Sequence, residues 1–157
     1  MNRFNRLILL SFACIASTAH AQDIRWLAAS NGAWSTAASW FNSLAPGAGT
    51  ATNDVYIDYT PYALTGGVNN FTTTLNYAAS VKRLFSRAGF TLQSNNLTLG
   101  ADGSIISGTF TMQAGGILGG KTIAFNGPVV LETGNAKTIA GTITTTSTAT
   151  LTGAYLL

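Results

Sequence analysis

The chain has 157 residues and a formal net charge of +3, and only 8% of its residues are charged. So small a charged fraction argues against a helical protein, whose exposed faces need Glu, Lys and Arg. Gly and Thr are abundant instead, a composition that favours strands joined by tight turns. The length suits one domain of ordinary size. We therefore expect an all-β protein.

Residues 1–21 predict a secretory signal peptide. Two Arg residues near the start precede an apolar run over residues 7–15, and an Ala-His-Ala cleavage pattern ends at Ala21. This run is too short to remain in a bilayer, and no later stretch reaches the ~20 apolar residues that spanning requires. We expect cleavage between Ala21 and Gln22. The mature chain would have no integral membrane segment and would reside in the periplasm, at the outer-membrane surface or outside the cell.

Cleavage would remove the single Cys and the single His of the sequence, Cys14 and His20. Six basic and five acidic residues would remain, a net charge of about +1. Without Cys and His, the mature chain can form no disulfide, no Ser-His-Asp or Cys-His arrangement and no His/Cys zinc site. We therefore expect no cofactor and no bound metal, and we expect that the protein is not an enzyme.

The segment 22–54 is unusual because its three Trp residues lie among small ones. Trp26, Trp34 and Trp40 are followed by a Pro46-Gly47 turn. If strand repeats follow, the first repeat needs a cover for its apolar core and its unpaired backbone. Three Trp side chains suit that role, since each buries on the order of 200 Å². The alternative is a platform on which sugar rings stack.

A thirteen-residue spacing of apolar residues marks the segment 55–157 as a repeat region, and it is clearest over 84–135. Each unit alternates apolar and polar residues and then turns at Gly, Asn or Asp, the pattern of a strand with one buried face. The three series of apolar residues are Leu84, Leu97, Phe110 and Ile123; Leu92, Ile105, Leu118 and Leu131; and Leu99, Met112 and Phe125.

Two strand-turn elements in thirteen residues give six or seven residues per element. Three elements would make a coil of about twenty residues and a triangular right-handed parallel β-helix, whereas two would make a flattened, two-sided β-solenoid. We prefer the triangular coil. Because one coil cannot bury its own apolar face, stability must come from stacked neighbours. In this register Leu118 is expected to lie between Ile105 and Leu131.

Two local motifs are weighed against this repeat. Residues 115–122 match a phosphate-binding loop, but that chemistry needs a helix directly after the loop. The residues that follow are strand-like and contain Gly127-Pro128, so we interpret the match as part of the repeat. The basic stretch 82–87 is interpreted as solvated side chains at a coil edge, and we expect no nucleic-acid partner.

The carboxylates are the remaining candidates for chemistry. Asp54 and Asp58 flank Val-Tyr-Ile, and in a strand they would stand about 13 Å apart. Paired glycosidase carboxylates lie ~5–9.5 Å apart, so the pair fits poorly. Asp102 is typical of a turn residue. An alternative polysaccharide lyase or glycoside hydrolase would have to use Asp54, Asp58, Asp102 or Glu132, with Arg83 or Arg87.

Residues 26–58 carry the order Trp, Gly-x-Trp, Trp, Pro-Gly and Asp-Val-Tyr-Ile-Asp, and Thr- and Gly-rich repeats follow. This arrangement resembles the start of exported bacterial β-strand-repeat proteins, which include autotransporter passengers and β-helical surface adhesins. The resemblance implies a β-helix displayed at the cell surface. The sequence ends without the C-terminal barrel, sorting signal or anchoring helix that such proteins usually carry, so one interpretation is a truncated passenger.

We therefore expect an exported structural or adhesive surface module that presents a stacked β-helix surface. The alternative is a carbohydrate-binding or polysaccharide-degrading β-helix protein. Expected partners are surface glycans, or a second copy through the C-terminal coil, because no charged residue follows Lys137 and no Pro follows Pro128. Trp26, Trp34 and Trp40 are the candidate carbohydrate contacts.

Overall fold

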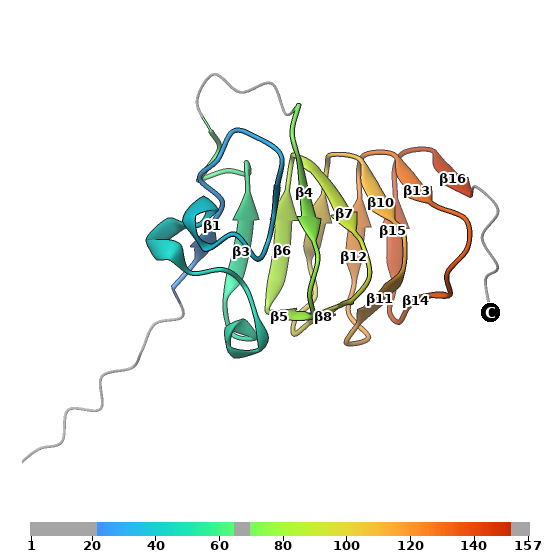
Figure 1. Ribbon diagram of the computed structural model, residues 1–157. Helices are drawn as coiled ribbons and strands as arrows, with labels where there is room; N and C mark the ends of the chain where they lie inside the picture. Colours follow the sequence, from blue (N-terminus) through green and yellow to red (C-terminus); the bar gives the residue numbers. More distant parts are fainter. Residues whose placement is uncertain (1–21, 65–69, 152–157) are drawn as a thin grey trace, which may run out of the picture.

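The computed structural model describes residues 22–64 and 70–151, which form a β-solenoid of stacked parallel coils with almost no helix (Figure 1). Its strands belong to three parallel sheets, so the cross-section has three sides. Sheet 1 contains β1 (Ile24–Arg25), β3 (Asp54–Ile57), β6 (Arg83–Ser86), β9 (Ser104–Ile106), β12 (Ile123–Phe125) and β15 (Ile143–Thr145). Sheet 2 contains β2 (Gly32–Ala33), β4 (Thr72–Leu75), β7 (Gly89–Leu92), β10 (Phe110–Met112), β13 (Val129–Leu131) and β16 (Ala149–Leu151). Sheet 3 contains β5 (Ala79–Val81), β8 (Asn96–Leu99), β11 (Gly115–Leu118) and β14 (Lys137–Ile139).

One coil is about twenty residues long, as the triangular prediction required. Phe85 pairs with Ile105 on sheet 1, and Phe90 pairs with Phe110 on sheet 2. The first coil is longer, because Val55 pairs with Leu84, and its extra residues lie between β3 and β4. The sequence prediction of three elements per coil is therefore confirmed, and the flattened two-sided alternative is wrong.

The thirteen-residue spacing has a geometric origin in this coil. A step of thirteen residues is one coil of twenty minus one side of about seven, so it advances along two sides of the coil and arrives at a different sheet. Leu84 on sheet 1, Leu97 on sheet 3 and Phe110 on sheet 2 follow this path, and the third step returns to sheet 1 at Ile123. All four side chains are buried. The thirteen-residue spacing therefore corresponds to the length of two of the three sides and not to one complete coil.

The expected stacking of Leu118 between Ile105 and Leu131 is wrong. Leu118 pairs with Thr98, and Ile105 pairs with Phe85 and Ala124. Both Leu118 and Ile105 point outward and are half-buried, whereas their strand neighbours Ile117 and Ile106 are buried. The three sides differ in length, and a shift of one residue turns a strand side chain to the opposite face.

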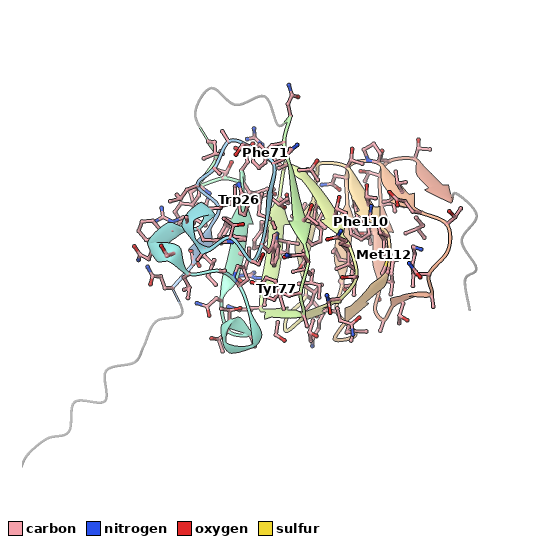
Figure 2. All side chains as sticks on the ribbon, in the orientation of Figure 1. Trp26, Phe71, Tyr77, Phe110 and Met112 are labelled. Carbon is pink, nitrogen blue, oxygen red and sulfur yellow. The ribbon has the colours of Figure 1, made fainter. Side chains whose placement is uncertain are left out.

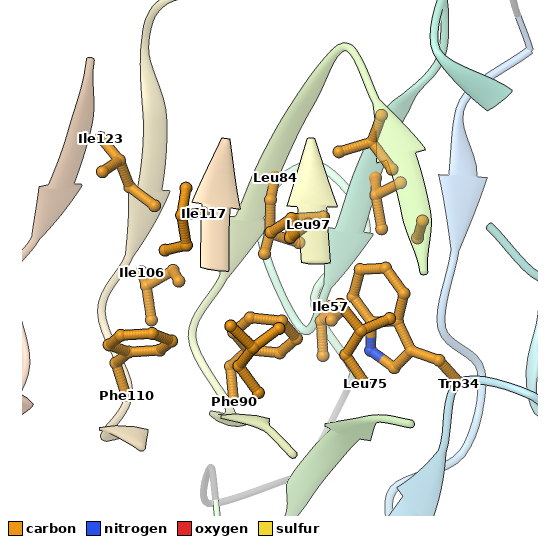
Figure 3. Packing of buried hydrophobic residues seen from close by; sticks show 14 of the residues in the cluster. Trp34, Ile57, Leu75, Leu84, Phe90, Leu97, Ile106, Phe110, Ile117 and Ile123 are labelled. Atoms are coloured by element: carbon orange, nitrogen blue, oxygen red, sulfur yellow. The ribbon is translucent and has the colours of Figure 1, made fainter. Parts of the chain in front are cut away.

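The core is a continuous apolar column inside the three sheets (Figure 3). An aromatic file runs along it, because the rings of Trp34 and Phe90 lie 5.4 Å apart between centroids, those of Phe90 and Phe110 lie 6.0 Å apart, and those of Phe110 and Phe125 lie 4.7 Å apart. Parallel in-register strands place equivalent side chains on top of one another. Each coil is thus buried by the coils on either side of it.

The segment from residue 22 to residue 53 covers the N-terminal end of this column (Figure 1). On sheet 1, β1 pairs with β3, and on sheet 2, β2 pairs with β4. On sheet 3 a short 3-10 helix, η3 (Ala48–Thr50), packs against β5, and Thr50 Oγ1 donates a hydrogen bond of 2.8 Å to the Ser80 carbonyl. The cap is therefore a partial coil that occupies all three sides.

Two further 3-10 helices, η1 (Ala37–Ser39) and η2 (Phe41–Ser43), complete the cap. The predicted signal peptide over residues 1–21 and its predicted cleavage site at Ala21 lie outside the described residues, although Gln22 is included. Over the described ranges, the chain contains no helix whose length and apolar character would let it cross a membrane.

Candidate functional site on the outer face of sheet 1

The three Trp residues predicted as a cap or a sugar platform are packed into one cluster. Trp26 and Trp40 meet edge to face with ring centroids 4.9 Å apart, and Trp34 and Trp40 meet in the same way at 5.3 Å. Their exposed fractions are 1%, 0% and 1% for Trp26, Trp34 and Trp40. Stacking a sugar requires an open ring face, and rings buried to this extent present none. Figure 2 labels Trp26 at the N-terminal end of the solenoid.

Backbone contacts hold this cluster in place. Trp40 Nε1 donates a hydrogen bond of 2.9 Å to the Trp34 carbonyl, and the Leu27 amide donates one of 2.8 Å to the Ser39 carbonyl. Gly32 lies directly against the Trp26 ring, and a Cβ at this position would come within 2.9 Å of the ring carbons. A side chain at Gly32 would therefore collide with the Trp26 ring.

The candidate catalytic carboxylates do not gather at one place. Asp58 lies at the corner between sheets 1 and 2, Glu132 at the corner between sheets 2 and 3, and Asp102 at the corner between sheets 3 and 1. Asp54 shares its corner with Asp102, but the coil that contains Arg83 separates them. In the part of the chain that the structure describes, no group of three or more His, Cys, Asp or Glu side chains could hold a metal ion.

Each of these carboxylates has a local structural partner. Asp102 Oδ1 accepts a hydrogen bond of 2.7 Å from the Thr122 amide, and Asp58 Oδ1 accepts one of 2.7 Å from the Leu64 amide. Glu132 Oε1 accepts a weak hydrogen bond of 3.4 Å from Gln113 Nε2, on the neighbouring coil. Asp58 is almost fully buried and adopts a φ of 45°. These contacts tie turns and coils together.

The predicted basic cluster is divided between the two ends of β6. Lys82 is exposed before the strand, and Arg87 lies beyond the other end. Arg83 binds Asp54 with two hydrogen bonds, one of them 2.9 Å from Nε to Oδ1. This hydrogen bond raises the pKa of Arg83.

Residues 115–122 form β11 and a turn that enters β12, so the helix required by a phosphate-binding loop is replaced by a strand.

The most unusual exposed surface lies on the outer face of sheet 1, at its first two coils. In-register pairing places Arg25, Tyr56 and Phe85 in one outward row. The rings of Tyr56 and Phe85 are stacked, with centroids 5.1 Å apart and planes 16° from parallel. Adjacent strands lie about 4.8 Å apart, so rings in such a row must touch.

Residues outside the strands add three more rings to this row, one from η2 and two from the segment after β3. Tyr62 meets Tyr56 edge to face at 5.1 Å, and the rings of Tyr59 and Phe85 lie 5.5 Å apart. The Arg25 guanidinium lies 3.9 Å from the Phe41 ring centroid and 4.4 Å from that of Tyr62. All the members of this group are half-buried, and we call them the aromatic patch: Arg25, Phe41, Tyr56, Tyr59, Tyr62 and Phe85.

Two carboxylates balance the two guanidinium groups at the aromatic patch. Asp54 pairs with Arg83, and Asp23 Oδ2 accepts a hydrogen bond of 3.2 Å from the Tyr62 hydroxyl. Burial raises the pKa of Tyr56, and the nearby carboxylates of Asp23 and Asp54 act in the same direction. The aromatic patch therefore combines half-exposed rings with a charge-balanced set of hydrogen-bonding groups.

Sequence reasoning missed the aromatic patch because it searched for Trp residues and for acidic pairs. A signal was present: Tyr56 and Phe85 lie at the polar positions of alternating strands, next to the buried Val55 and Leu84. An aromatic residue at an outward strand position is a feature that sequence periodicity can reveal. The contribution of Phe41 and Tyr62 depends on loop geometry and could not be found in this way.

Comparisons with family models, curated proteins and solved structures find no match. The β-solenoid fold that the resemblance implied is confirmed by the stacked coils of the structure.

Proposed function

We propose that this chain is an exported structural or adhesive module, which acts through the outer faces of its solenoid. The observation that supports this most directly is the aromatic patch, because a group of half-exposed rings outside the core is typical of an interaction surface. The outward positions of the other two sheets carry mainly small hydroxyl side chains in the same coils, such as Thr74 and Thr91 on sheet 2 and Ser80 and Thr98 on sheet 3.

The solenoid supports an adhesive role in a second way. The stacking of coils produces flat, rigid faces whose side chains are held in register, which limits the entropy lost on binding. The charge-poor composition leaves these faces largely uncharged, so contacts must come from rings, hydroxyl groups and backbone rather than from charge. Export is supported by the predicted signal peptide, which lies outside the described residues.

The test has two parts, one for export and one for adhesion. The full chain is expressed in a bacterial host, and the secreted or periplasmic fraction is analysed by mass spectrometry for a mature N-terminus at Gln22. The control carries Leu9→Arg and Leu10→Arg, which interrupt the apolar run and should retain the protein in the cytoplasm.

Adhesion is measured with beads coated with the exported protein and with a folded, unrelated β-protein of similar size. We expect the coated beads to attach to bacterial or polysaccharide-coated surfaces more strongly than the control beads. Equal attachment of both kinds of bead would contradict the adhesive role, and an uncleaved cytoplasmic chain would contradict export.

A further inference from the structure

The geometry points to the aromatic patch as a binding site for neutral polysaccharide chains. This inference rests on the proposed function, because it names the ligand class of the module's most distinctive outer face. Trp26, Trp34 and Trp40, the candidates for sugar contact under the alternative to a cap, are buried. The aromatic patch instead offers rings that remain in contact with water.

The rings supply the apolar part of the site. Tyr56 and Phe85 form a continuous aromatic strip over two coils, and Tyr59 and Tyr62 extend it to the side. A pyranose ring has apolar C–H faces that pack well against aromatic side chains, whereas its rim carries hydroxyl groups. Recognition sites for such ligands combine apolar and aromatic surface with a small number of fixed polar groups.

The polar groups of the aromatic patch are held in place by their neighbours. Phe41 and Tyr62 lie against the Arg25 guanidinium, so its in-plane N–H groups remain available as donors. Within residues 22–64 and 70–151, the only ion pair of the protein is that of Arg83 with Asp54. The Asp23 carboxylate accepts a hydrogen bond from the Tyr62 hydroxyl, and its oxygens can accept further hydrogen bonds.

The charge balance selects a neutral ligand over an acidic one. Arg25 and Arg83 are matched by Asp23 and Asp54, and the Arg83 charge is directly paired. A uronate chain would gain one contact with Arg25 but would approach two carboxylates. A neutral chain can accept hydrogen bonds from the Arg25 guanidinium and donate to the Asp23 carboxylate without repulsion, whereas the buried Asp54 is already paired with Arg83. The half-buried Arg25 and Asp23 side chains can bind hydroxyl groups through charge-assisted hydrogen bonds.

The experiment measures binding of the purified exported chain to insoluble cellulose, chitin and a β-1,3-glucan, with polygalacturonate and alginate as acidic probes. Arg25→Gln removes the guanidinium but changes no core side chain, and Phe85→Ala removes one ring of the strip. Thr91→Ala is the matched control, because Thr91 occupies an outward position on sheet 2 in the same coil as Phe85. Circular dichroism confirms that each variant is folded.

We expect binding to at least one neutral polysaccharide, a loss of about tenfold or more in affinity for Arg25→Gln and for Phe85→Ala, and no change for Thr91→Ala. If Phe85→Ala does not fold, Arg25→Gln decides alone. No binding by the folded wild-type chain, binding to the acidic probes only, or an equal loss in Thr91→Ala would each overturn the inference. A chain whose coated beads still adhere without polysaccharide binding would remain an adhesive module with a different ligand.

Discussion

The two ends of the described solenoid differ in how their apolar side chains are covered. At the N-terminal end, the cap residues Ile24 and Trp34 are fully buried. At the other end, Ile143 occupies the inward register position that Ile123 occupies one coil earlier, yet Ile143 is 44% exposed and Ile123 is 1% exposed. A strand in this fold therefore does not bury its own core residue. Burial comes from the next coil, and at the N-terminal end the Trp cluster takes the place of that coil.

The largest expected effect is the loss of this cover. Trp34→Ala should reduce the free energy of unfolding by about 3–5 kcal/mol, because it removes a fully buried ring between Trp40 and Phe90 and leaves a cavity. Urea denaturation followed by circular dichroism measures it. Leu27→Ala is the control in the same cap, since Leu27 is 50% exposed, and it should change stability by less than about 0.5 kcal/mol. Equal effects of the two substitutions would contradict the assigned role of the cap.

The same Ile-to-Ala substitution at two positions with equal register but different burial tests whether burial sets the cost in stability. Ile123→Ala should cost about 2–5 kcal/mol of unfolding free energy, whereas Ile143→Ala should cost less than about 1 kcal/mol. The two residues are aligned partners, but β12 is paired on both sides whereas β15 is the last strand in the order of sheet 1. Chemical denaturation of both variants gives the difference. Costs within error of each other would show that the coil containing β15 is buried in solution by a further contact.

The exposed apolar side chain near β15 also predicts self-association. We expect the average mass of the purified chain to rise with concentration in static light scattering. The reason is that β15 is the last strand in the order of sheet 1 and carries the exposed apolar side chain of Ile143. Ile143→Lys should reduce this association. Leu27→Lys, which adds the same charge at an exposed apolar position of the N-terminal cap, should not. A wild-type chain that stays monomeric at high concentration would refute the prediction.

The smallest expected effect is a loss of stability at alkaline pH that originates near the capped end. Burial raises the pKa of Tyr56 and of Tyr77 above the ordinary Tyr value of about 10. A raised pKa in the folded state means that the neutral form is favoured, so this stabilisation is complete below pH ~10 and is lost as the pH rises through the folded-state pKa.

This effect is checked by measuring the free energy of unfolding of the wild type and of Tyr56→Phe between pH ~8 and ~11. The decline with rising pH should be shallower in the variant, because it has one fewer Tyr to ionise. Identical slopes for the two proteins would show that Tyr56 contributes nothing to the pH dependence. Hydrogen exchange would locate the first loss of protection, which we expect at β3 and β4 rather than at β12 and β13.

The apolar spacing of the sequence predicted some core residues correctly and others wrongly. Leu84 and Leu97 were predicted as core residues and are buried, because inward strand positions repeat with the coil. Ile105 and Leu118 obey the same spacing but point outward. These residues differ in direction because the sides of the coil vary by one residue in length. The thirteen-residue spacing is an average over the sides and does not show this variation.

The candidate site was less accessible to prediction than the fold. Asp102 was predicted as a turn residue and lies between β8 and β9, where its Oδ1 accepts a hydrogen bond from the Thr122 amide of the next coil. Trp26, Trp34 and Trp40 were correctly singled out, but sequence alone left a cap and a sugar platform open, since the same residues serve either role. The Tyr56 and Phe85 row was not found, although its alternation with Val55 and Leu84 was visible in the sequence.

The sequence by itself determined the all-β class and the stacked repeat, and it favoured a three-sided coil of about twenty residues over a flattened two-sided one. These are properties of local alternation and spacing, which act within one or two coils. Only the tertiary structure decided which side chains of the second series point outward, that the Trp rings are buried, and that Arg25, Phe41 and Tyr62 meet the Tyr56 and Phe85 row. These facts depend on the exact length of each side and on the path of the loops, and both are set by how neighbouring coils pack against one another.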